Sequence, residues 1–244
     1  MRIAVIADIH ANLEALRAVL DRIAGLNINA TVCLGDIVGY NANPNECVEL
    51  IRKSNIACVL GNHDACASGR EEPEHFTPFA RKALFWTREQ LTGENSRFLA
   101  DLPREKNMHG VYLFHGSVHD TNRYLLSPMD AAHNFELLHE QAGVPMTYFF
   151  GHTHRKIAWM EHGGVVSSER PLELMLSSEK QYLINPGSVG QPRDGDPRSS
   201  FLVYDQEDCT VTFFSVEYDI KTCQDKIVRA GLPPQLAERL AWGR

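Results

Sequence analysis

Five short polar clusters in this chain combine carboxylates, histidines and an asparagine, which are residue types that bind metal ions. Each cluster follows directly after an apolar run with the length and the β-branched or aromatic content of a buried strand. The clusters are Asp8-Ile-His10, Gly35-Asp36, Gly61-Asn62-His63-Asp64, His115-Gly116 and Gly151-His152-Thr153-His154. Because open α/β sheets bind ligands where strands end and loops begin, we expect the clusters to meet there. The combination favours a hydrolytic centre with two metal ions.

Two divalent cations held close together need a carboxylate between them to offset their repulsion. Asp36 is the best candidate for this bridge, because its short side chain follows a strand and lies beside Gly35, which permits a close approach. Asn62 offers a carbonyl oxygen without adding charge, and His115 offers an imidazole. Mixed nitrogen and oxygen ligation without thiolate suits Mn, Fe, Zn, Co or Ni better than Ca or Mg, and the identity of the metals stays open.

Two further pairs of candidate ligands are spaced two residues apart: Asp8 with His10, and His152 with His154. Side chains alternate with a period of two in extended backbone, so we expect both members of each pair to face the same point. A water bound between the cations would lose a proton near neutral pH and become the nucleophile that attacks a phosphoester. His63 is next to a candidate ligand without being one, and we expect it to protonate the leaving oxygen.

Each cluster also has a purely structural interpretation. Taken alone, Asp8, His10 and Asn12 are more typical of a helix N-terminus with its capping residues. Gly35-Asp36 alone is more typical of a turn, and His115-Gly116 of the end of a strand. The two clusters with paired polar residues after Gly61 and Gly151 are more specific, because histidines after buried strands rarely serve packing. We therefore base the metal-centre hypothesis on the five clusters together.

Other reactive side chains lack a partner pattern. We expect surface or helical positions for five further histidines, which are His75, His109, His133, His139 and His162. Cys66 borders the third cluster, but no basic residue adjoins it, so we interpret it as a small, partly buried thiol rather than a nucleophile. The six cysteines form no CxxC pair, which is typical of reduced cysteines in a cytosolic protein.

Length and composition constrain the architecture and the partners. A chain of 244 residues that is 43% hydrophobic can bury one sizeable core, so we expect a single domain over residues 1–244, with helical segments at about 219–242. A formal charge of −7 provides no basic surface for long nucleic acid or anionic membranes, whereas a small phosphoester substrate is compatible with it. The absence of a signal-peptide pattern and of a long apolar stretch leads us to expect a cytoplasmic protein.

The first half of the chain alternates strands and helices in the βαβ pattern of a parallel sheet. We expect strands at 2–7, 31–34 and 56–60, helices at 12–25 and 45–53, a polar loop at 65–78, and then a helix that carries Phe79, Leu84, Trp86 and Leu91. A helix at 130–141 is expected to return through Pro145 to a strand at 146–150.

The pattern of predicted elements changes after residue 156. Short strands joined by turns follow there, which indicates an antiparallel sheet. The expected strands are 157–161, 164–167, 172–176, 181–184, 200–204 and 210–216. The last helical segments lie on either side of residues 231–234, because two prolines there force a break.

As a set and in this order, the five clusters resemble the signature of the calcineurin-like metallophosphoesterase family, D-x-H, G-D, G-N-H-D/E, H and G-H-x-H. The resemblance implies an α/β fold, a four-layer α/β/β/α sandwich with two mixed β-sheets. It implies a first metal bound by Asp8, His10, Asp36 and His154, and a second bound by Asp36, Asn62, His115 and His152. It also implies that His63 is an acid or transition-state stabiliser. Asp64 adjoins His63 and is a second catalytic candidate, although neighbouring side chains in a turn often diverge.

Further stretches resemble the small prokaryotic single-domain phosphoesterases, namely residues 35–40, 115–117 with Tyr124-Leu125 after them, 185–194 and 231–240. Their resemblance implies a dinuclear-metal-dependent phosphodiesterase or phosphatase that acts on small nucleotide-like substrates. A catalytically silent protein-binding scaffold of the same fold is one alternative, and a nuclease on short oligonucleotides is another. A silent scaffold would be expected to lose metal ligands, so the complete set of ligand residues favours an active enzyme.

One stretch departs from the family pattern. Gly39-Tyr40-Asn41 stands where protein phosphatases and symmetrical dinucleoside tetraphosphatases carry Asp-Arg-Gly. The carboxylate that would orient His63 and the arginine that would bind phosphate are both absent there, which disfavours these two activities and leaves the orienting partner of His63 open. Arg193 is a candidate phosphate ligand, because the glycine-rich residues 186–192 can bring it to the site; a surface arginine in a turn is an equal alternative.

Overall fold

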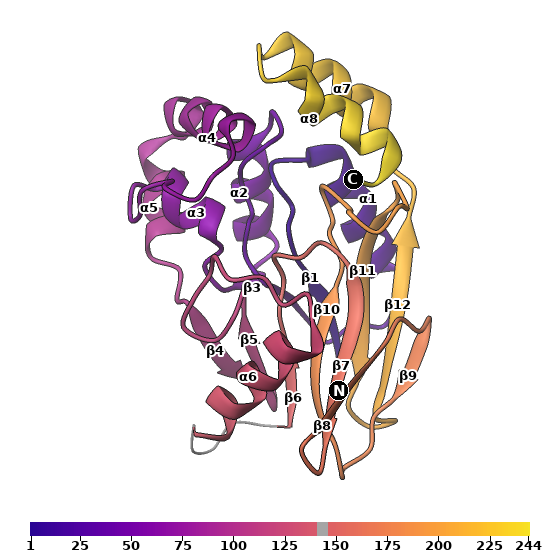
Figure 1. Ribbon diagram of the computed structural model, residues 1–244. Coiled ribbons are helices and arrows are strands. Elements are labelled where there is room, and N and C mark those ends of the chain that lie inside the picture. The colour runs from indigo at the N-terminus through magenta and orange to yellow at the C-terminus, as the bar shows by residue number, and fades with distance from the viewer. Residues whose placement is uncertain (141–145) are drawn as a thin grey trace.

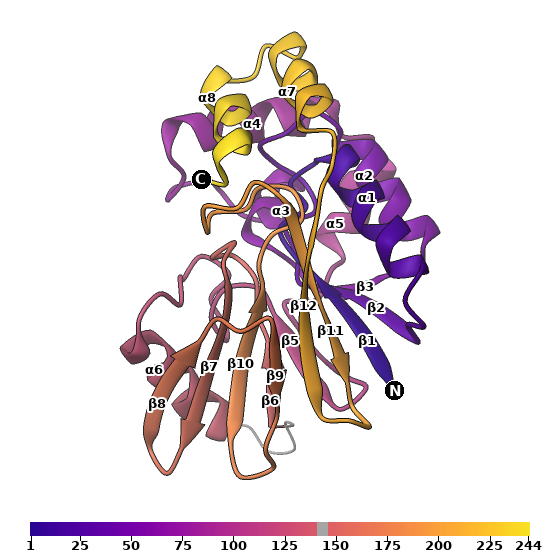
Figure 2. The same cartoon turned by 90° about the vertical axis from the view of Figure 1, so that its right-hand side faces the viewer.

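Two mixed β-sheets pack face to face in the computed structural model of the protein, which describes residues 1–140 and 146–244. Helices cover the outer face of each sheet, and further helices lie beyond one end of the sandwich (Figures 1 and 2). The protein is therefore a four-layer α/β/β/α sandwich, as the sequence predicted.

The first sheet is built on three parallel strands joined by helices. These elements are β1 (Arg2–Ile6), α1 (Leu13–Ala24), β2 (Ala30–Cys33), α2 (Pro44–Lys53) and β3 (Ala57–Cys58). The side chain of Asn12 caps α1 by accepting a hydrogen bond from the Ala15 N–H, so the predicted cap is confirmed. β3 covers only part of the predicted 56–60, because the Leu60 N–H donates to the Pro103 carbonyl instead of to a strand.

Three later strands extend this sheet on the other side of β1, all through antiparallel pairs. They are β11 (Ser199–Asp205), β12 (Thr210–Val216) and β9 (Glu173–Met175). The complete order is β3-β2-β1-β11-β12-β9.

The second sheet has the order β4-β5-β6-β10-β7-β8, and its strands are β4 (Glu105–Met108), β5 (Val111–Phe114), β6 (Thr147–Phe149), β10 (Gln181–Pro186), β7 (Lys156–His162) and β8 (Val165–Glu169). All six strands predicted after residue 156 exist, but the prediction that they form one antiparallel sheet is wrong. Three of them join each sheet, and β10 pairs in parallel with β6. Hydrophobic alternation specifies which face of a strand is buried, but it does not specify the neighbouring strand.

Three helices follow β3: α3 (Asn62–Ala67), α4 (Pro78–Gln90) and α5 (Gly93–Ala100). The predicted polar loop at 65–78 is therefore wrong at its start, where α3 continues to Ala67. Polar residues of the third cluster form the first turn of α3, and Asp64 accepts a hydrogen bond from the Gly61 N–H there. Helix α5 and strand β4 are not among the elements predicted from the sequence.

The remaining helices are α6 (Pro128–His139), α7 (Ile220–Arg229), α8 (Pro234–Glu238) and the 3-10 helix η1 (Arg239–Trp242). The predicted end of α6 at Gln141 and the return through Pro145 lie outside the described residues. The C-terminal helices pack with α4 above one end of the sheets (Figure 1). Within the described chain, none of the helices is long and apolar enough to cross a membrane.

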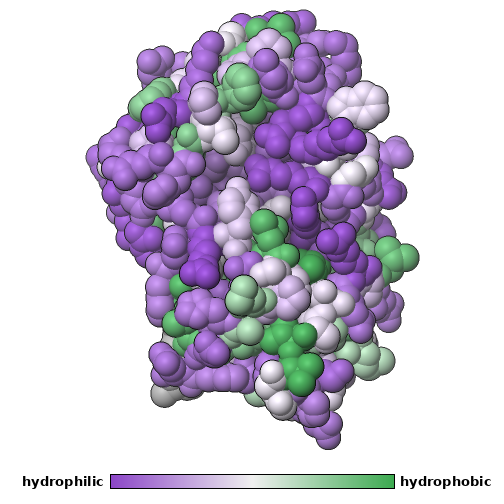
Figure 3. All heavy atoms as spheres, in the orientation of Figure 1, coloured by the Kyte–Doolittle hydropathy of each residue, from purple (hydrophilic) through white to green (hydrophobic). Residues whose placement is uncertain are grey.

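Alternate residues of each strand build separate layers of the core. In β1, Ile3 and Val5 lie between the two sheets, whereas Ala4 and Ile6 belong to the layer under α1 and α2. The third layer lies between the second sheet and α6, whose Phe135 packs against Tyr148. Hydrophilic residues cover most of the face in Figure 3, and hydrophobic residues gather in its lower half, where α6 and β8 lie in Figure 1.

We expect Phe135→Ala to lower the free energy of unfolding by about 3–5 kcal/mol, because truncation of a buried aromatic ring leaves a cavity. Phe135 is 1% exposed, whereas Met129 on the same helix is 80% exposed. Met129→Ala is therefore the matched control, with an expected change within about 0.5 kcal/mol. Urea unfolding measures both. Equal stability of the two variants would contradict the packing of α6 on the second sheet.

Candidate metal centre

The five clusters meet at one end of the sandwich, where strands of both sheets end. Three clusters follow β1, β2 and β3 of the first sheet, and two follow β5 and β6 of the second. Backbone hydrogen bonds join the loops, for example from His10 N–H to the Asp36 carbonyl (2.8 Å) and from Gly151 N–H to the His115 carbonyl (2.7 Å). All seven predicted ligands are buried, with at most 5% exposure. The structure thus brings together every residue that the sequence analysis proposed as a ligand.

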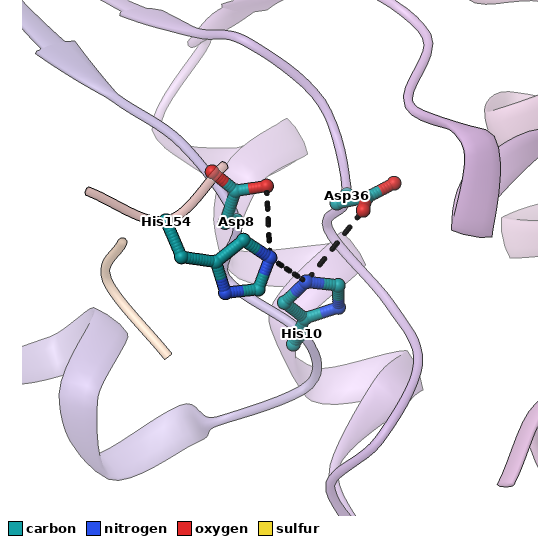
Figure 4. Close-up of side chains that lie close together, drawn as sticks. All are labelled: Asp8, His10, Asp36 and His154. Atoms are coloured by element: carbon teal, nitrogen blue, oxygen red, sulfur yellow. Dashed lines mark hydrogen bonds and ion pairs between the residues drawn. The ribbon is translucent and has the colours of Figure 1, made fainter. Parts of the chain in front are cut away.

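Asp8, His10, Asp36 and His154 form the first group, in which one ligand atom of each side chain lies within 4.8 Å of the others. Nε2 of His10 is 3.1 Å from Nε2 of His154, and the latter is 3.5 Å from Oδ1 of Asp8. Figure 4 shows the four side chains pointing toward one another. Asp8 and His10 come from the loop after β1, Asp36 from the loop after β2, and His154 from the loop after β6. These are the four residues that the family resemblance implies for the first metal.

The two close imidazole nitrogens of this group both carry lone pairs. Nδ1 of His10 contacts the Val38 carbonyl (3.2 Å), and Nδ1 of His154 contacts the Gln191 carbonyl (2.6 Å). Because a carbonyl only accepts hydrogen bonds, each Nδ1 carries the proton and each Nε2 is unprotonated in the neutral ring. Two lone pairs that face each other at 3.1 Å repel, and a shared cation would turn this repulsion into ligation. The group therefore fits a metal ion.

Asp36, His115 and His152 form a second group by the same distance criterion, and the Asn62 side-chain oxygen lies 3.2 Å from Nε2 of His115. Nδ1 of His115 is 2.7 Å from the Leu34 carbonyl, which leaves Nε2 for a ligand. In His152 the roles are reversed, because Nε2 contacts the backbone carbonyl of Asn122 (3.1 Å) and Nδ1 is left. The contact with Asn122 is not predicted from the sequence, because only the backbone carbonyl of this residue takes part.

Asp36 belongs to both groups. Its Oδ2 atom lies 3.5 Å from Nε2 of His10 and 3.3 Å from Nε2 of His115, and it is buried without a well-formed hydrogen bond from the described chain. Oδ1 accepts a hydrogen bond from the His63 N–H (2.8 Å). A Cβ atom at Gly61 would overlap this oxygen, so only glycine permits the approach of the two loops. One free carboxylate oxygen between two groups of nitrogen ligands fits the bridging role predicted for Asp36.

Five of the seven predicted ligands have left-handed backbone, with φ between 48° and 67°. They are Asp8, His10, Asp36, His152 and His154. The prediction that Asp8 and His10 face one point through extended alternation is therefore wrong, and so is that for His152 and His154. Each pair converges through a tight left-handed turn instead. This conformation costs free energy in residues other than glycine, so the surrounding fold must impose it.

The protonation of three histidines suits metal binding. Burial lowers the pKa of His10 and of His154 well below the usual value, and it lowers the pKa of His152 to about 3. All three imidazoles are therefore neutral near pH 7, which is the form that binds metals.

His115 and Asp36 behave as an ion pair. Burial disfavours the charged form of His115, but the Asp36 carboxylate outweighs it and raises the pKa of His115 to about 9. Burial likewise opposes the charge of Asp36, yet His115 and His63 hold the pKa of Asp36 below its usual range. Burial raises the pKa of Asp8 to about 7. The proton on His115 supplies positive charge at the place where a bound cation would supply it.

His63 lies against the first group in an aromatic setting. Its ring centroid is 4.5 Å from those of Tyr40 and Phe76, and burial lowers its pKa to about 4. Its Nδ1 atom is buried and has no hydrogen-bond partner within the described residues. A Cβ atom at Gly39 would overlap this nitrogen, so there is no room for a side chain at Gly39. His63 is thus fixed by packing and not by an orienting carboxylate.

Asp64 points its carboxylate at backbone amides. Oδ1 accepts from the Val38 N–H (3.1 Å) and Oδ2 from the Gly61 N–H (3.3 Å). These contacts join the second and third clusters, which makes Asp64 a positioning residue in this geometry. A catalytic role for Asp64 stays a prediction that its contacts do not favour.

Arg193 lies at the mouth of the site. Its backbone N–H donates to the His154 carbonyl (3.1 Å), and its guanidinium donates to the hydroxyls of Tyr40 (3.3 Å) and Tyr124 (3.5 Å). The Tyr124 ring stacks on His152 with centroids 4.0 Å apart. The turn after β10 therefore brings Arg193 to the candidate ligands. Tyr40 and Tyr124 both lie in or after stretches that resemble the small prokaryotic phosphoesterases, but their contacts with Arg193 are not predicted from the sequence.

A cavity of about 140 Å³ opens between these groups, and Asp36, His63, His152, Arg193, Tyr124 and Phe76 are among the residues that line it. The five histidines expected at the surface are all exposed, and one of them, His75, borders this cavity. Cys66 is buried, and burial raises its pKa to about 12, so the thiol does not act as a nucleophile near neutral pH.

Comparison with known proteins finds relatives along the whole chain. The sequence model of the calcineurin-like phosphoesterase superfamily domain matches residues 1–208. An uncharacterized protein of Methanocaldococcus jannaschii, MJ0912, is 42% identical over 249 residues, which cover 99% of this chain and 98% of the relative.

Solved structures are also similar. A metallophosphoesterase from Sphaerobacter thermophilus has a TM-score of 0.87 and 40% identity, with 100% of this chain and 99% of that chain covered. The protein PH1004 from Pyrococcus horikoshii has a TM-score of 0.81 at 23% identity, with 100% and 98% covered, and this likeness concerns the fold alone.

We expect the affinity of the metal-depleted protein for Mn²⁺ to increase with pH. His115 holds a proton below about pH 9 and Asp8 below about pH 7, and a cation must displace these protons to bind. Affinity should therefore rise up to about tenfold per pH unit for each proton displaced, and level off above the pKa of His115.

Calorimetric titrations in two buffers that differ in ionisation enthalpy measure the protons released. The exposed His162 serves as a control site, because His162→Ala should leave the pH dependence unchanged. Binding without proton release below the pKa of Asp8 would contradict this account of the site.

Proposed function

We propose that this chain, which belongs to the calcineurin-like phosphoesterase superfamily, hydrolyses phosphoester bonds with two bound metal ions. The observation that carries the proposal is the Oδ2 atom of Asp36, which lies within 3.5 Å of a histidine nitrogen of each ligand group. A buried carboxylate oxygen that is shared by two such groups is suited to bridging two cations. The membership of the family supports the same activity.

Nitrogen and oxygen donors, without cysteine, make up both groups. We infer that Asp8, His10, Asp36 and His154 hold one cation. We infer that Asp36, Asn62, His115 and His152 hold the other. Such donors suit Mn, Fe, Zn, Co or Ni. When bound, the two cations supply an activated water and offset the negative charge of the phosphoryl oxygens.

The chain's own groups have distinct parts in the proposed reaction. Arg193 binds a phosphoryl oxygen, because its guanidinium faces the cavity and, among the described residues, donates hydrogen bonds to neutral oxygens. His63 hydrogen-bonds the leaving oxygen through its neutral imidazole, and the negative charge of a bound phosphoester raises the pKa of this ring. Tyr40 and Phe76 exclude water from one side of His63.

The size of the cavity and the charge of the protein support a small substrate. About 140 Å³ suits a phosphoryl group and its nearest substituents, such as a small nucleotide-like phosphodiester or monoester. The formal charge of −7 does not favour long nucleic acid. All six cysteines are free, which supports a reducing compartment such as the cytoplasm. No observation favours the scaffold or the nuclease over this function.

We expect Asp36→Asn and His152→Ala to reduce both bound metal and hydrolysis, because each removes a proposed ligand. His63→Ala should retain the metal but slow turnover by about a hundred- to ten-thousand-fold. Elemental analysis and hydrolysis of bis-p-nitrophenyl phosphate measure the two quantities, with the exposed His133→Ala as control. Full metal occupancy and undiminished turnover in all three site variants would rule out the two-metal assignment.

We expect Arg193→Ala to reduce kcat/KM by about ten- to a hundredfold without loss of metal, because a charge-assisted hydrogen bond to phosphate is removed. Arg17→Ala is the matched control, since Arg17 is exposed on α1, away from the cavity. Steady-state kinetics and elemental analysis of both variants provide the test. An Arg193→Ala enzyme with the kinetics of the Arg17→Ala enzyme would exclude the phosphate contact.

A further inference from the structure

Two arginines from distant parts of the chain meet at Tyr40, beside the proposed catalytic cavity. The guanidinium carbon of Arg193 lies 5.8 Å from the centre of the Tyr40 ring, and that of Arg239 lies at the same distance. Arg193 follows β10, whereas Arg239 begins η1 near the C-terminus. Tyr40 itself stacks near His10 of the first ligand group, with centroids 4.5 Å apart. The two cations are thus one aromatic ring away from the candidate metal centre.

Neither arginine has an aspartate or glutamate partner at ion-pair distance in the described chain. The arginines that do form ion pairs there are Arg2, Arg52, Arg88, Arg104, Arg123 and Arg198. Arg193 donates to the hydroxyls of Tyr40 and Tyr124 and to the Gln191 side chain, and its Nε atom is buried without a partner. Arg239 donates through Nε to the main-chain oxygen of Arg244 (2.5 Å), where the described chain ends and where a terminal carboxylate would offset part of its charge. Asp8 acts on Arg193 only at longer range.

The two arginines line adjoining cavities. The catalytic cavity contains Arg193, and a second cavity of about 260 Å³ contains Arg239 together with Phe79 and Leu236. Tyr40, Thr77 and Ala80 line both cavities. The second cavity therefore adjoins the first across Tyr40, Thr77 and Ala80.

Two arginines at one ring without an aspartate or glutamate partner are unusual in a chain with a formal charge of −7. Burial lowers the pKa of Arg239, and repulsion from Arg193 lowers it further. An anion between the two guanidinium groups would remove this repulsion and satisfy their free N–H groups. Phosphate is well matched, since the planar guanidinium fork binds two of its oxygens at once.

We propose that Arg239 and Arg193 together bind a second phosphoryl group of the substrate, so that the substrates are phosphoesters with at least two linked phosphoryl groups, such as nucleoside diphosphate derivatives. Both guanidinium carbons lie 5.8 Å from the centre of the Tyr40 ring, which places the two groups on one aromatic side chain that lines both cavities. The inference rests on the proposed function for the position of the scissile phosphoryl group. The apolar Phe79 and Leu236 then face the organic part of the substrate.

The test compares two ligands that cannot be hydrolysed, methylphosphonate and methylenediphosphonate, which carry one and two phosphoryl-like groups. Calorimetry of the metal-loaded protein gives both dissociation constants. We expect Arg239→Gln to lower the preference for methylenediphosphonate over methylphosphonate by about tenfold, because a charge-assisted contact to the second group is lost. Arg239→Lys keeps the charge without the fork, and it should retain part of the preference.

Arg229→Gln is the matched control, because it removes the same charge from an exposed position on the neighbouring α7. It should leave the preference unchanged. If both ligands weaken equally in Arg239→Gln, or if Arg229→Gln has the same effect, this inference is overturned and the proposed function stands. If methylphosphonate does not bind the metal-loaded wild-type protein at all, the proposed function fails, and this inference fails with it.

Discussion

Burial of the Asp36 carboxylate among histidine nitrogens is the constraint on which the rest of the site depends. A charge removed from water in this way costs several kcal/mol unless an opposite charge compensates it. The protein provides that compensation through His115, which the carboxylate holds in its protonated form with a pKa of about 9. The Asp36 carboxylate lies between two groups of side chains that carry lone pairs. Metal cations can bind several of these lone pairs at once, whereas a proton cannot. The arrangement of ligands thus follows from the need to neutralise one buried oxygen.

The two-sheet architecture makes this burial possible. Three of the loops follow strands of the first sheet and two follow strands of the second, so neither sheet alone completes either ligand group. The loops are held by hydrogen bonds between one another, and five ligand residues adopt left-handed backbone. Such strain persists only where the surrounding structure is rigid, and the layered core supplies that rigidity. The ligands are therefore positioned by the scaffold before any cation binds.

Gly39 and Tyr40 explain how the site differs from the family branches that carry Asp-Arg-Gly at this place. The His63 ring lies so close to Gly39 that a side chain at position 39 would overlap its Nδ1 atom, and the ring packs on Tyr40 and Phe76 instead. Tyr40 replaces an arginine, yet it orders Arg193 and Arg239 around its own ring. Two other segments thus supply the positive charge through Arg193 and Arg239. Arg239 lines the cavity that adjoins the catalytic one, so the positive surface continues beyond the candidate metal centre. A change in substrate, rather than a loss of activity, is the simplest consequence.

The sequence alone determined the strand-end clusters, the parallel start of the fold and the seven candidate ligands, because these depend on residue type and local spacing. Hydrophobic alternation located the later strands, yet it did not assign β10 to one sheet and β11 to the other, since pairing depends on distant contacts. Asn122, Tyr124 and Arg239 reach the site through the fold, and the resemblance of the stretches around Tyr124 and Arg239 does not predict their contacts. Only the tertiary structure decided the left-handed turns at the ligands and the meeting of two arginines on Tyr40, because both are imposed by packing between remote segments.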